Sequence, residues 1–418
     1  MRTAMRTAMS ELHYDMVIVG GGPAGLTLAL ALTRAMAGLK LALVDRRPFS
    51  VPKDQRASAI AAGVRRVFEQ LGAWDEVEPF SEPIRRMKIT DSGSGDMSRP
   101  LFLSFDGEVK PGEPFAHMVP NTALAASLLK ALDGKVDLIA PAEVMGFSRD
   151  GAEARVSLAD GRALLAPLVV ASDGAMSAMR GFAGIGTFGH DYGQSGIVTT
   201  IAHTLPHEGT AYEHFRPHGP FASLPLPSIG ATHRSSLVWT ETTADAARVK
   251  ANPPEAIAAE IAEVMGYSLG EVTLEENTVQ SFPLRLQIAK SFVAPRLALI
   301  GDAAHVIHPV AGQGLNLGLK DVAALAEVVI DAMRLGQDHG TADILERYQR
   351  WRRFDTTLMA MVSDGMTRLF SNDLAPIRAA RDLGLGVVDR LGPLKDFMIS
   401  RAAGVDRGGP KLLRGLKI

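Results

Sequence analysis

The sequence predicts an α/β protein in which a Rossmann-like nucleotide-binding domain carries a β-sheet second domain and a helical C-terminal region. Three observations predict this fold class. A strand, a glycine turn and a helix follow one another from Tyr14, strand-like segments dominate 189–282, and the pattern becomes helical after Asp343. At 418 residues the chain suits two or three packed lobes, which is enough to bury a sizeable cofactor.

The first motif is a dinucleotide-binding turn within YDMVIVGGGPAGLTLALALTRAMAGLKLALVDRR. Gly20 permits the turn, Gly22 lets the backbone approach a pyrophosphate, and Gly25 lets the helix pack on the strand. Asp45 ends the second strand, where its carboxylate can accept hydrogen bonds from an adenosine ribose. The motif predicts nucleotide binding and alone does not separate NAD from FAD.

The second motif is VVASDGAMSAMR, residues 169–180, where the chain returns to the nucleotide-binding lobe. The pair Asp173 and Gly174 follows a short strand, so its backbone amides can lie near phosphates. The same pair also suits an ordinary β-turn, and both interpretations stay open at this point.

The third motif is LIGDAAHVIHPVAGQGLNLGLKD, residues 299–321. Asp302 at a strand end can hold a polyol hydroxyl. The glycine turn starts a helix whose first amides can face a developing negative charge, such as the charge on a reduced flavin. This motif therefore favours a flavin site.

Together these residues resemble the flavoprotein aromatic hydroxylases of the para-hydroxybenzoate hydroxylase fold. More narrowly, they resemble the ubiquinone-biosynthesis hydroxylases, the polyprenylphenol monooxygenases, from about residue 14 into the C-terminal helices. GPFASLPLP from Gly219 and SFPLRLQIA from Ser281 are further family-like stretches. The resemblance implies noncovalent FAD, NAD(P)H as co-substrate, and hydroxylation of a polyprenylphenol ring with O2 through a flavin C4a-hydroperoxide.

The resemblance also implies roles for individual residues. The ADP half of FAD would contact Gly20, Gly22, Gly25, Asp45 and Arg46, and Arg56 would reach the pyrophosphate or ribityl chain. Asp173 and Arg180 would serve both FAD and the nicotinamide donor, and Asp302 would bind the ribityl chain. Pro309 would border the isoalloxazine as the candidate catalytic position, with the amides of Gly312, Gln313, Gly314, Leu315 and Asn316 at its pyrimidine edge.

Several of these side chains have plainer interpretations. Arg56 suits a solvated helix charge, Asn121 suits a helix N-cap as well as an FAD contact, and His305 and His308 suit packing roles beside the flavin. No metal site is expected: His203, His207, His214 and His218 have no helical register and no clustered carboxylates.

The expected organisation is a disordered leader over 1–13 and a discontinuous FAD-binding domain over 14–82, 105–188 and 283–345. The β-sheet substrate domain is expected over 83–104 and 189–282, and the helical region over 346–418. Helices are predicted over 54–73, 121–132 and 253–265, and a small β-meander over 143–171.

Composition excludes several other functions. The net charge of −2 provides no field for nucleic acid, and the absence of cysteine excludes disulfides, thiolate metal sites and cysteinyl-flavin. The sequence contains no apolar run long enough to predict a membrane span. We expect a cytoplasmic protein, with peripheral contact to the inner membrane or a biosynthetic complex as a further hypothesis.

That hypothesis depends on a basic C-terminal tail. Its cations are Arg390, Lys395, Arg401, Arg407, Lys411, Arg414 and Lys417, interleaved near the end with Leu412, Leu413, Leu416 and Ile418. Such a tail forms a solvated surface, or it docks on anionic lipid or a partner protein.

Three other functions stay open. The first is a hydroxylase of the same fold acting on a small soluble aromatic acid. The second is a flavin-dependent isoprenoid reductase without oxygen insertion, and the third is a flavin-carrying scaffold subunit.

Overall fold

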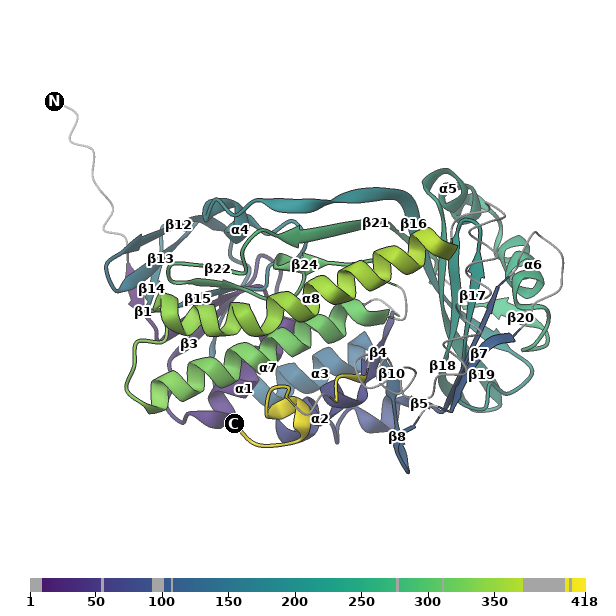
Figure 1. The fold of residues 1–418 in the computed structure, drawn as a ribbon, viewed down its shortest axis with the longest axis horizontal. Coiled ribbons are helices and arrows are strands. Elements are labelled where there is room, and N and C mark those ends of the chain that lie inside the picture. The colour runs from purple at the N-terminus through teal and green to yellow at the C-terminus, as the bar shows by residue number, and fades with distance from the viewer. Residues whose placement is uncertain are drawn as a thin grey trace.

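The computed structural model describes residues 10–53, 56–91, 101–106, 108–275, 278–309, 312–370, 403–405 and 408–418. Figure 1 shows a helix-rich lobe on the left and a sheet-rich lobe on the right, joined by long strands and by one long helix.

The helix-rich lobe is built on a six-stranded sheet with the order β11, β3, β2, β15, β23, β22. Its strands are β2 (Met16–Val19), β3 (Leu41–Val44), β11 (Asp137–Ile139), β15 (Val169–Ala171), β22 (Val293–Ala294) and β23 (Leu297–Leu299). All neighbours pair in parallel except β22, which pairs antiparallel to β23. The inner strands are fully buried, as continuous apolar runs in a parallel sheet should be.

The helices of this lobe are α1 (Pro23–Ala35), α2 (Ala62–Gln70), α3 (Asn121–Leu132), the short α4 (Ala178–Phe182) and α7 (Gln313–Arg334). Among them, α1 contacts β2 and β3 of the parallel sheet. The helix α1 contacts both α3 and α7. The predicted helix over 121–132 is confirmed by α3.

A four-stranded sheet flanks the lobe, with the order β1 (Glu11–His13), β14 (Ala163–Ala166), β13 (Glu153–Leu158), β12 (Val144–Asp150). The leader expected over 1–13 is therefore too long. Residues 11–13 pair in parallel with 163–165, so their backbone groups are satisfied by a sheet. Residues 1–9 lie outside the described part of the chain.

A three-stranded sheet contains β5 (Glu82–Ile84), β4 (Ala57–Ala61) and β10 (Ala116–Pro120), with β10 in the middle. The continuous helix predicted over 54–73 is wrong, because 57–61 is a strand and α2 begins only at Ala62. Antiparallel pairing with β10 outweighs the helical propensity of these alanines.

The sheet-rich lobe centres on a nine-stranded sheet. Its strands are β6 (Arg86–Asp91), β7 (Leu101–Asp106), β16 (Thr187–His203), β17 (Thr210–Arg216), β18 (Gly219–Ile229), β19 (Thr232–Thr242), β20 (Val272–Leu274), β21 (Gln280–Ala289) and β24 (His305–Val306). The long strands β16 and β21 connect the two lobes (Figure 1). Smaller elements are β8 (Glu108–Lys110), β9 (Glu113–Pro114), and the 3-10 turns at Glu78–Phe80 and Leu412–Arg414.

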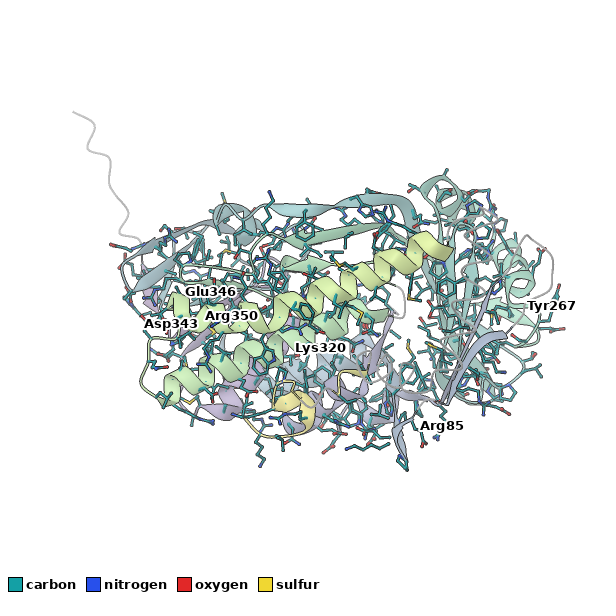
Figure 2. All side chains as sticks on the ribbon, viewed as in Figure 1. Arg85, Tyr267, Lys320, Asp343, Glu346 and Arg350 are labelled. Carbon is teal, nitrogen blue, oxygen red and sulfur yellow. The ribbon has the colours of Figure 1, made fainter. Side chains whose placement is uncertain are left out.

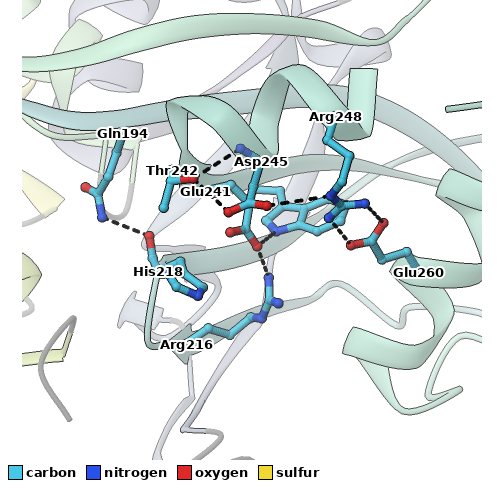
Figure 3. Close-up of polar contacts among 9 residues, drawn as sticks. Gln194, Arg216, His218, Glu241, Thr242, Asp245, Arg248 and Glu260 are labelled. Carbon is cyan, nitrogen blue, oxygen red and sulfur yellow. Dashed lines mark hydrogen bonds and ion pairs between the residues drawn. The ribbon is translucent and has the colours of Figure 1, made fainter. Parts of the chain in front are cut away.

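The helical insertion of this lobe is a pair, α5 (Thr243–Ala251) and α6 (Pro254–Met265), where the sequence predicts one helix over 253–265. The helix α5 follows β19 directly, and Thr242 accepts a hydrogen bond from the Asp245 amide as its cap. Figure 3 shows the polar contacts beside it. Buried Glu241 accepts hydrogen bonds from Arg216, at 2.6 Å, and from the indole of Trp239, at 2.8 Å.

The long helix α8 (Ala342–Phe370) crosses from one lobe to the other and begins before the predicted boundary at 346. Residues 371–402 and 406–407 lie outside the described chain, and with them Arg390, Lys395, Arg401 and Arg407. No described helix is both long enough and apolar enough to cross a bilayer.

The described end of the tail packs on the FAD-binding lobe. Leu412 and Leu413 are buried in the main apolar core, beside α2. Lys411 lies 3.6 Å from carboxylate oxygens of Glu327 and Asp331 on α7. The hypothesis that these two leucines dock on lipid is therefore wrong for them, because they already stabilise the protein's own core.

Candidate FAD site

The three sequence motifs meet at one edge of the parallel sheet. Strand register places Val19, Ala171 and Leu299 side by side on β2, β15 and β23. The turns that follow these strands are the glycine turn, the Asp-Gly turn and the Gly301–Ala303 turn. Ligands of open α/β sheets bind outside the carboxyl ends of the strands, so this edge is the candidate site.

The glycines of the first motif separate into two kinds. A Cβ on Gly20, whose φ is +114°, would lie 2.2 Å from the Ser172 carbonyl oxygen, and one on Gly25 would lie 2.0 Å from the Gly20 carbonyl oxygen. A Cβ on Gly22 would meet no described atom within 4 Å. Packing thus requires the first and third glycines, whereas Gly22 borders open space at the start of α1, where a pyrophosphate fits.

Asp45 directly follows β3, and its side chain holds the glycine turn. Its Oδ2 accepts a hydrogen bond from the Gly21 amide at 2.7 Å, and its Oδ1 accepts one from the Arg47 amide at 2.8 Å. Arg46 beside it is exposed. Contact of Asp45 and Arg46 with the ADP half stays a prediction.

The side chains of the second motif are engaged within the protein. Asp173 accepts hydrogen bonds from the Ser177 hydroxyl, at 2.5 Å, and from the Met179 amide, at 3.1 Å, which stabilises the start of α4. Arg180 donates to the carbonyl oxygens of Ala303, at 2.9 Å, and Ala175, at 2.8 Å. Burial lowers the pKa of Arg180. This arginine therefore joins the second motif to the third.

Asp302 lies on the Gly301–Ala303 turn with its side chain exposed. The surrounding protein nevertheless raises the pKa of its carboxyl through burial. Because solvent reaches this carboxylate at the end of β23, it can accept a ligand hydroxyl.

A buried network supports this turn from behind. Asp321 of α7 is fully buried and accepts hydrogen bonds from the Gly301 amide at 3.0 Å, from His305 Nε2 at 2.6 Å and from Arg352 Nε at 2.7 Å. Burial raises the pKa of Asp321, but the neighbouring His305 and Arg352 more than offset this, so the pKa is lowered. Asp321 is in the quoted motif, whereas no sequence signal singled out Arg352.

The N-terminus of α7 faces the same region. Gly312 adopts the left-handed conformation, and a Cβ on Gly314 would meet no described atom within 4 Å. The Asn316 side chain bonds to the Ala61 amide, at 2.9 Å, and to the Ala59 carbonyl, at 2.8 Å. Its side chain therefore joins α7 to β4, and what this helix start offers a cofactor is its backbone amides and its dipole.

The rest of this loop is described in part. Pro309 and Leu315 are half-buried and Gln313 is buried, while residues 310–311 lie outside the described chain. The expected contact between Pro309 and the isoalloxazine stays a prediction.

Arg56 lies directly before β4 rather than on a helix, so its interpretation as a solvated helix charge is wrong. Its guanidinium lies 5.1 Å from the centre of the Phe282 ring. The residue is half-buried, and its carbonyl accepts a hydrogen bond from the Asn121 amide at 2.9 Å. Asn121 itself is the first residue of α3, after the N-cap residue Pro120.

His308 is fully buried beside Pro309, and neither ring nitrogen has a hydrogen-bond partner among the described residues. Burial lowers its pKa to about 4, so the ring is neutral near pH 7. The Tyr192 ring packs edge-on at 5.0 Å, and the Tyr192 hydroxyl donates to Asp364 of α8 at 3.0 Å.

Histidines of the sheet-rich lobe are engaged in ordinary hydrogen bonds. The rings of His203 and His207 lie 5.9 Å apart. The His203 nitrogens contact the Leu205 carbonyl and the Ser235 hydroxyl, and His207 contacts the Leu226 carbonyl. Within the described chain, no group of three or more His, Asp or Glu side chains is placed to hold a metal ion.

A dinucleotide cradle lies at the end of a parallel sheet that is joined to a large second sheet, and together with the following family match and relatives this fold places the chain among the FAD-dependent monooxygenases. The family model described as FAD binding domain matches residues 13–361, and the chain belongs to this family. Within it, the chain is grouped with the ubiquinone hydroxylases by similarity over nearly its whole length.

The ubiquinone hydroxylase UbiL of Rhodospirillum rubrum is 42% identical over 99% of this chain and 95% of its own length. The 3-demethoxyubiquinol 3-hydroxylase of Escherichia coli K12 is 34% identical over 95% of this chain and 100% of its own. Among solved structures, p-nitrophenol 4-monooxygenase of Pseudomonas putida DLL-E4 superposes with a TM-score of 0.76. It covers 95% of this chain and 100% of its own at 19% identity, which shows the shared fold alone.

Proposed function

We propose that this enzyme hydroxylates the aromatic ring of a polyprenylphenol intermediate in ubiquinone biosynthesis, using NAD(P)H and O2. The observation that carries the proposal is end-to-end similarity to relatives named for ubiquinone hydroxylation. The cradle formed after β2, β15 and β23 supports it, because Gly22 and Gly314 border open space at the two helix starts where FAD is expected to bind.

Bound FAD would supply electron transfer from NAD(P)H and activation of oxygen. The chain's own residues would bind this FAD and orient it. The space beside Gly22 and the α1 amides would receive the pyrophosphate, and Asp302 would accept a ribityl hydroxyl. The amides at the start of α7 would stabilise negative charge on the reduced ring.

The cofactor is tested first by release. Acid or heat precipitation of the purified protein should free FAD into the supernatant and leave a colourless pellet. A yellow pellet would contradict noncovalent binding, and release of NAD in place of FAD would contradict the assignment of the cradle.

The reaction is tested by labelling in cells. Expression in a strain that lacks one ubiquinone ring hydroxylase should restore ubiquinone, and growth under 18O2 should show that the step converting the accumulated intermediate adds one labelled oxygen to the ring. The Asp302→Ala variant serves as the site control and should restore less. Quinone intermediates that accumulate without the enzyme identify which ring position it serves.

The same experiment separates the other candidate functions. A reductase of isoprenoid chains would alter the side chain without adding labelled oxygen. A scaffold subunit would restore no ubiquinone, because it could not replace the missing hydroxylase. A hydroxylase of small aromatic acids would leave the accumulated polyprenylphenol unchanged.

A further inference from the structure

His308 is a fully buried side chain whose two ring nitrogens have no hydrogen-bond partner among the described residues. The buried rings of His203, His207 and His305 each have at least one partner. Buried polar groups are nearly always hydrogen-bonded, so an exception in a folded protein needs an explanation. A water molecule or a ligand that contacts His308 would supply the missing partners.

The position of His308 in the fold favours a ligand. It follows β24, which pairs with β21 of the large sheet, and it precedes α7, whose first turn faces the candidate FAD site. Its neighbour Ile307 packs in the core of the FAD-binding lobe, whereas Tyr192 of β16 packs against its ring. The ring therefore lies where the two lobes meet, and substrates commonly bind at such domain interfaces.

One side of the His308 ring is closed by polar side chains that bond to one another. The Tyr192 ring packs edge-on with its centre 5.0 Å away, and the Tyr192 hydroxyl donates to Asp364 at 3.0 Å. Asp364 also pairs with Arg368 at 2.8 Å and lies 3.3 Å from His190 Nε2. Burial raises the pKa of Tyr192, and the bond to Asp364 raises it further, so this hydroxyl keeps its proton and its acceptor. Tyr192 thus fixes the ring without bonding to its nitrogens.

The helix α8 carries one half of this arrangement. Figure 2 labels Asp343 and Arg350 on the first half of α8, and the helix runs on from there toward the strand β16 that Figure 1 labels. Asp364 lies in the second half of α8, and Tyr192 lies on β16. Because α8 and β16 both connect the lobes, the elements that join the lobes also hold the His308 ring in place.

A neutral imidazole offers one hydrogen-bond donor and one acceptor. Burial lowers the pKa of His308 to about 4, so near pH 7 one ring nitrogen carries a hydrogen and the other is a bare acceptor. A phenol hydroxyl can donate to the bare nitrogen, and its oxygen can also accept. A carboxylate can only accept, and the neutral ring gives it no counter-charge. The ring therefore suits a phenol better than an aromatic acid.

We propose that His308 binds the phenol hydroxyl of the substrate and thereby orients the substrate ring at the junction of the two lobes. The bare nitrogen accepts the hydrogen bond, and no proton is transferred to it. Tyr192 and Asp364 act as positioning residues that hold the imidazole. This inference rests on the proposed function, because it takes the substrate to be a prenylated phenol.

The test compares two small probes, a phenol that carries one prenyl unit and the same compound without its hydroxyl. Calorimetry measures their binding to the FAD-loaded protein in the absence of NAD(P)H. Wild type should bind the phenol about tenfold more tightly than the compound without the hydroxyl. His308→Phe, which keeps an aromatic ring against Tyr192 but has no nitrogen, should lose this preference, and so should His308→Leu.

The matched control is His117→Phe. His117 is also a buried histidine whose pKa is lowered to about 4, mainly by burial, and its ring packs edge-on against Trp74. Loss of this second buried imidazole should leave the tenfold preference for the phenol unchanged. The FAD content of every variant is measured alongside.

Two results overturn the assignment of His308. Wild type binds the two probes equally or binds neither, or a His308 variant keeps the full preference for the phenol. Weaker FAD binding together with a full preference would assign the ring to the cofactor. A preference that depends on His308, without labelled oxygen in the cell experiment, contradicts only the proposed function. Labelled oxygen on the ring with equal binding of the two probes contradicts only the role of His308.

Discussion

At the scale of single residues, the glycines of the first motif show how one sequence pattern serves two physical needs. Gly20 and Gly25 allow backbone segments to touch, and Gly22 leaves room that no described part of the protein uses. The sequence predicted the GxGxxG pattern and the separate roles of its glycines. Only the structure shows that the space beside Gly22 is open.

Alanine substitution should therefore affect stability at Gly25 and FAD binding at Gly22. Gly25→Ala places its Cβ against the Gly20 carbonyl and should lower the free energy of unfolding by about 1 to 3 kcal/mol. Gly22→Ala, at an ordinary φ of −76°, should keep the stability of the apoprotein and weaken FAD binding by about tenfold or more. Chemical denaturation of apoprotein and FAD titration measure the two effects. If Gly22→Ala and wild type bound FAD with equal affinity, the pyrophosphate would have to bind elsewhere.

His308 should make stability fall with acidity. Its pKa is lowered from 6.5 to about 4 in the folded protein, so the unfolded state binds more protons between these values. The stability is full above pH 6.5 and is lost as pH falls toward 4, by about 3 kcal/mol. His308→Leu should remove this part of the slope in denaturation curves from pH 7 to 4, whereas exposed His13→Leu should keep it.

At the scale of elements, the sequence predicted those whose signal is local and missed those set by distant partners. The helix α3 has its own apolar face, and it formed where predicted. The strand β4 is rich in alanine and exists because β10 and Asn316 bond to its backbone. Likewise, Asp321 was part of a motif, but its partner Arg352 comes from another helix.

Asp321 should be the residue through which α7 and α8 hold the Gly301–Ala303 turn. Asp321→Asn removes the fully buried one of the two carboxylates that pair with buried Arg352, so the free energy of unfolding should fall by about 3 to 5 kcal/mol. The variant should also bind FAD more weakly, because the Gly301 amide and Asp302 lose their support. Thermal denaturation and FAD titration check both. Asp355→Asn, which changes the half-buried second partner of Arg352, should cost less. Equal losses for the two variants would contradict a special role for Asp321.

At the scale of the whole molecule, the nucleotide-binding lobe was predictable because its three motifs are short and chemically specific. Their convergence is a property of strand order, since β2, β15 and β23 are far apart in sequence and adjacent in the sheet. The position of the C-terminal tail was not predictable. Its alternation of leucine and basic residues suits a lipid surface as well as a core, and only the neighbouring α2 and α7 decide between them.

The tail should therefore act as part of the fold. Leu412 is 1% exposed, so Leu412→Ala should lower the free energy of unfolding by about 2 to 5 kcal/mol through the cavity it leaves. Leu416, four residues later in the same tail, is 48% exposed, and Leu416→Ala should change it by no more than about 0.5 kcal/mol. Denaturant unfolding of both variants measures the difference. If the tail were instead a lipid anchor that is free in solution, the two alanine variants would unfold at the same denaturant concentration and differ only in vesicle binding. Because Leu412 and Leu413 belong to the core that also contains β2 and β23, their loss should weaken FAD retention together with stability.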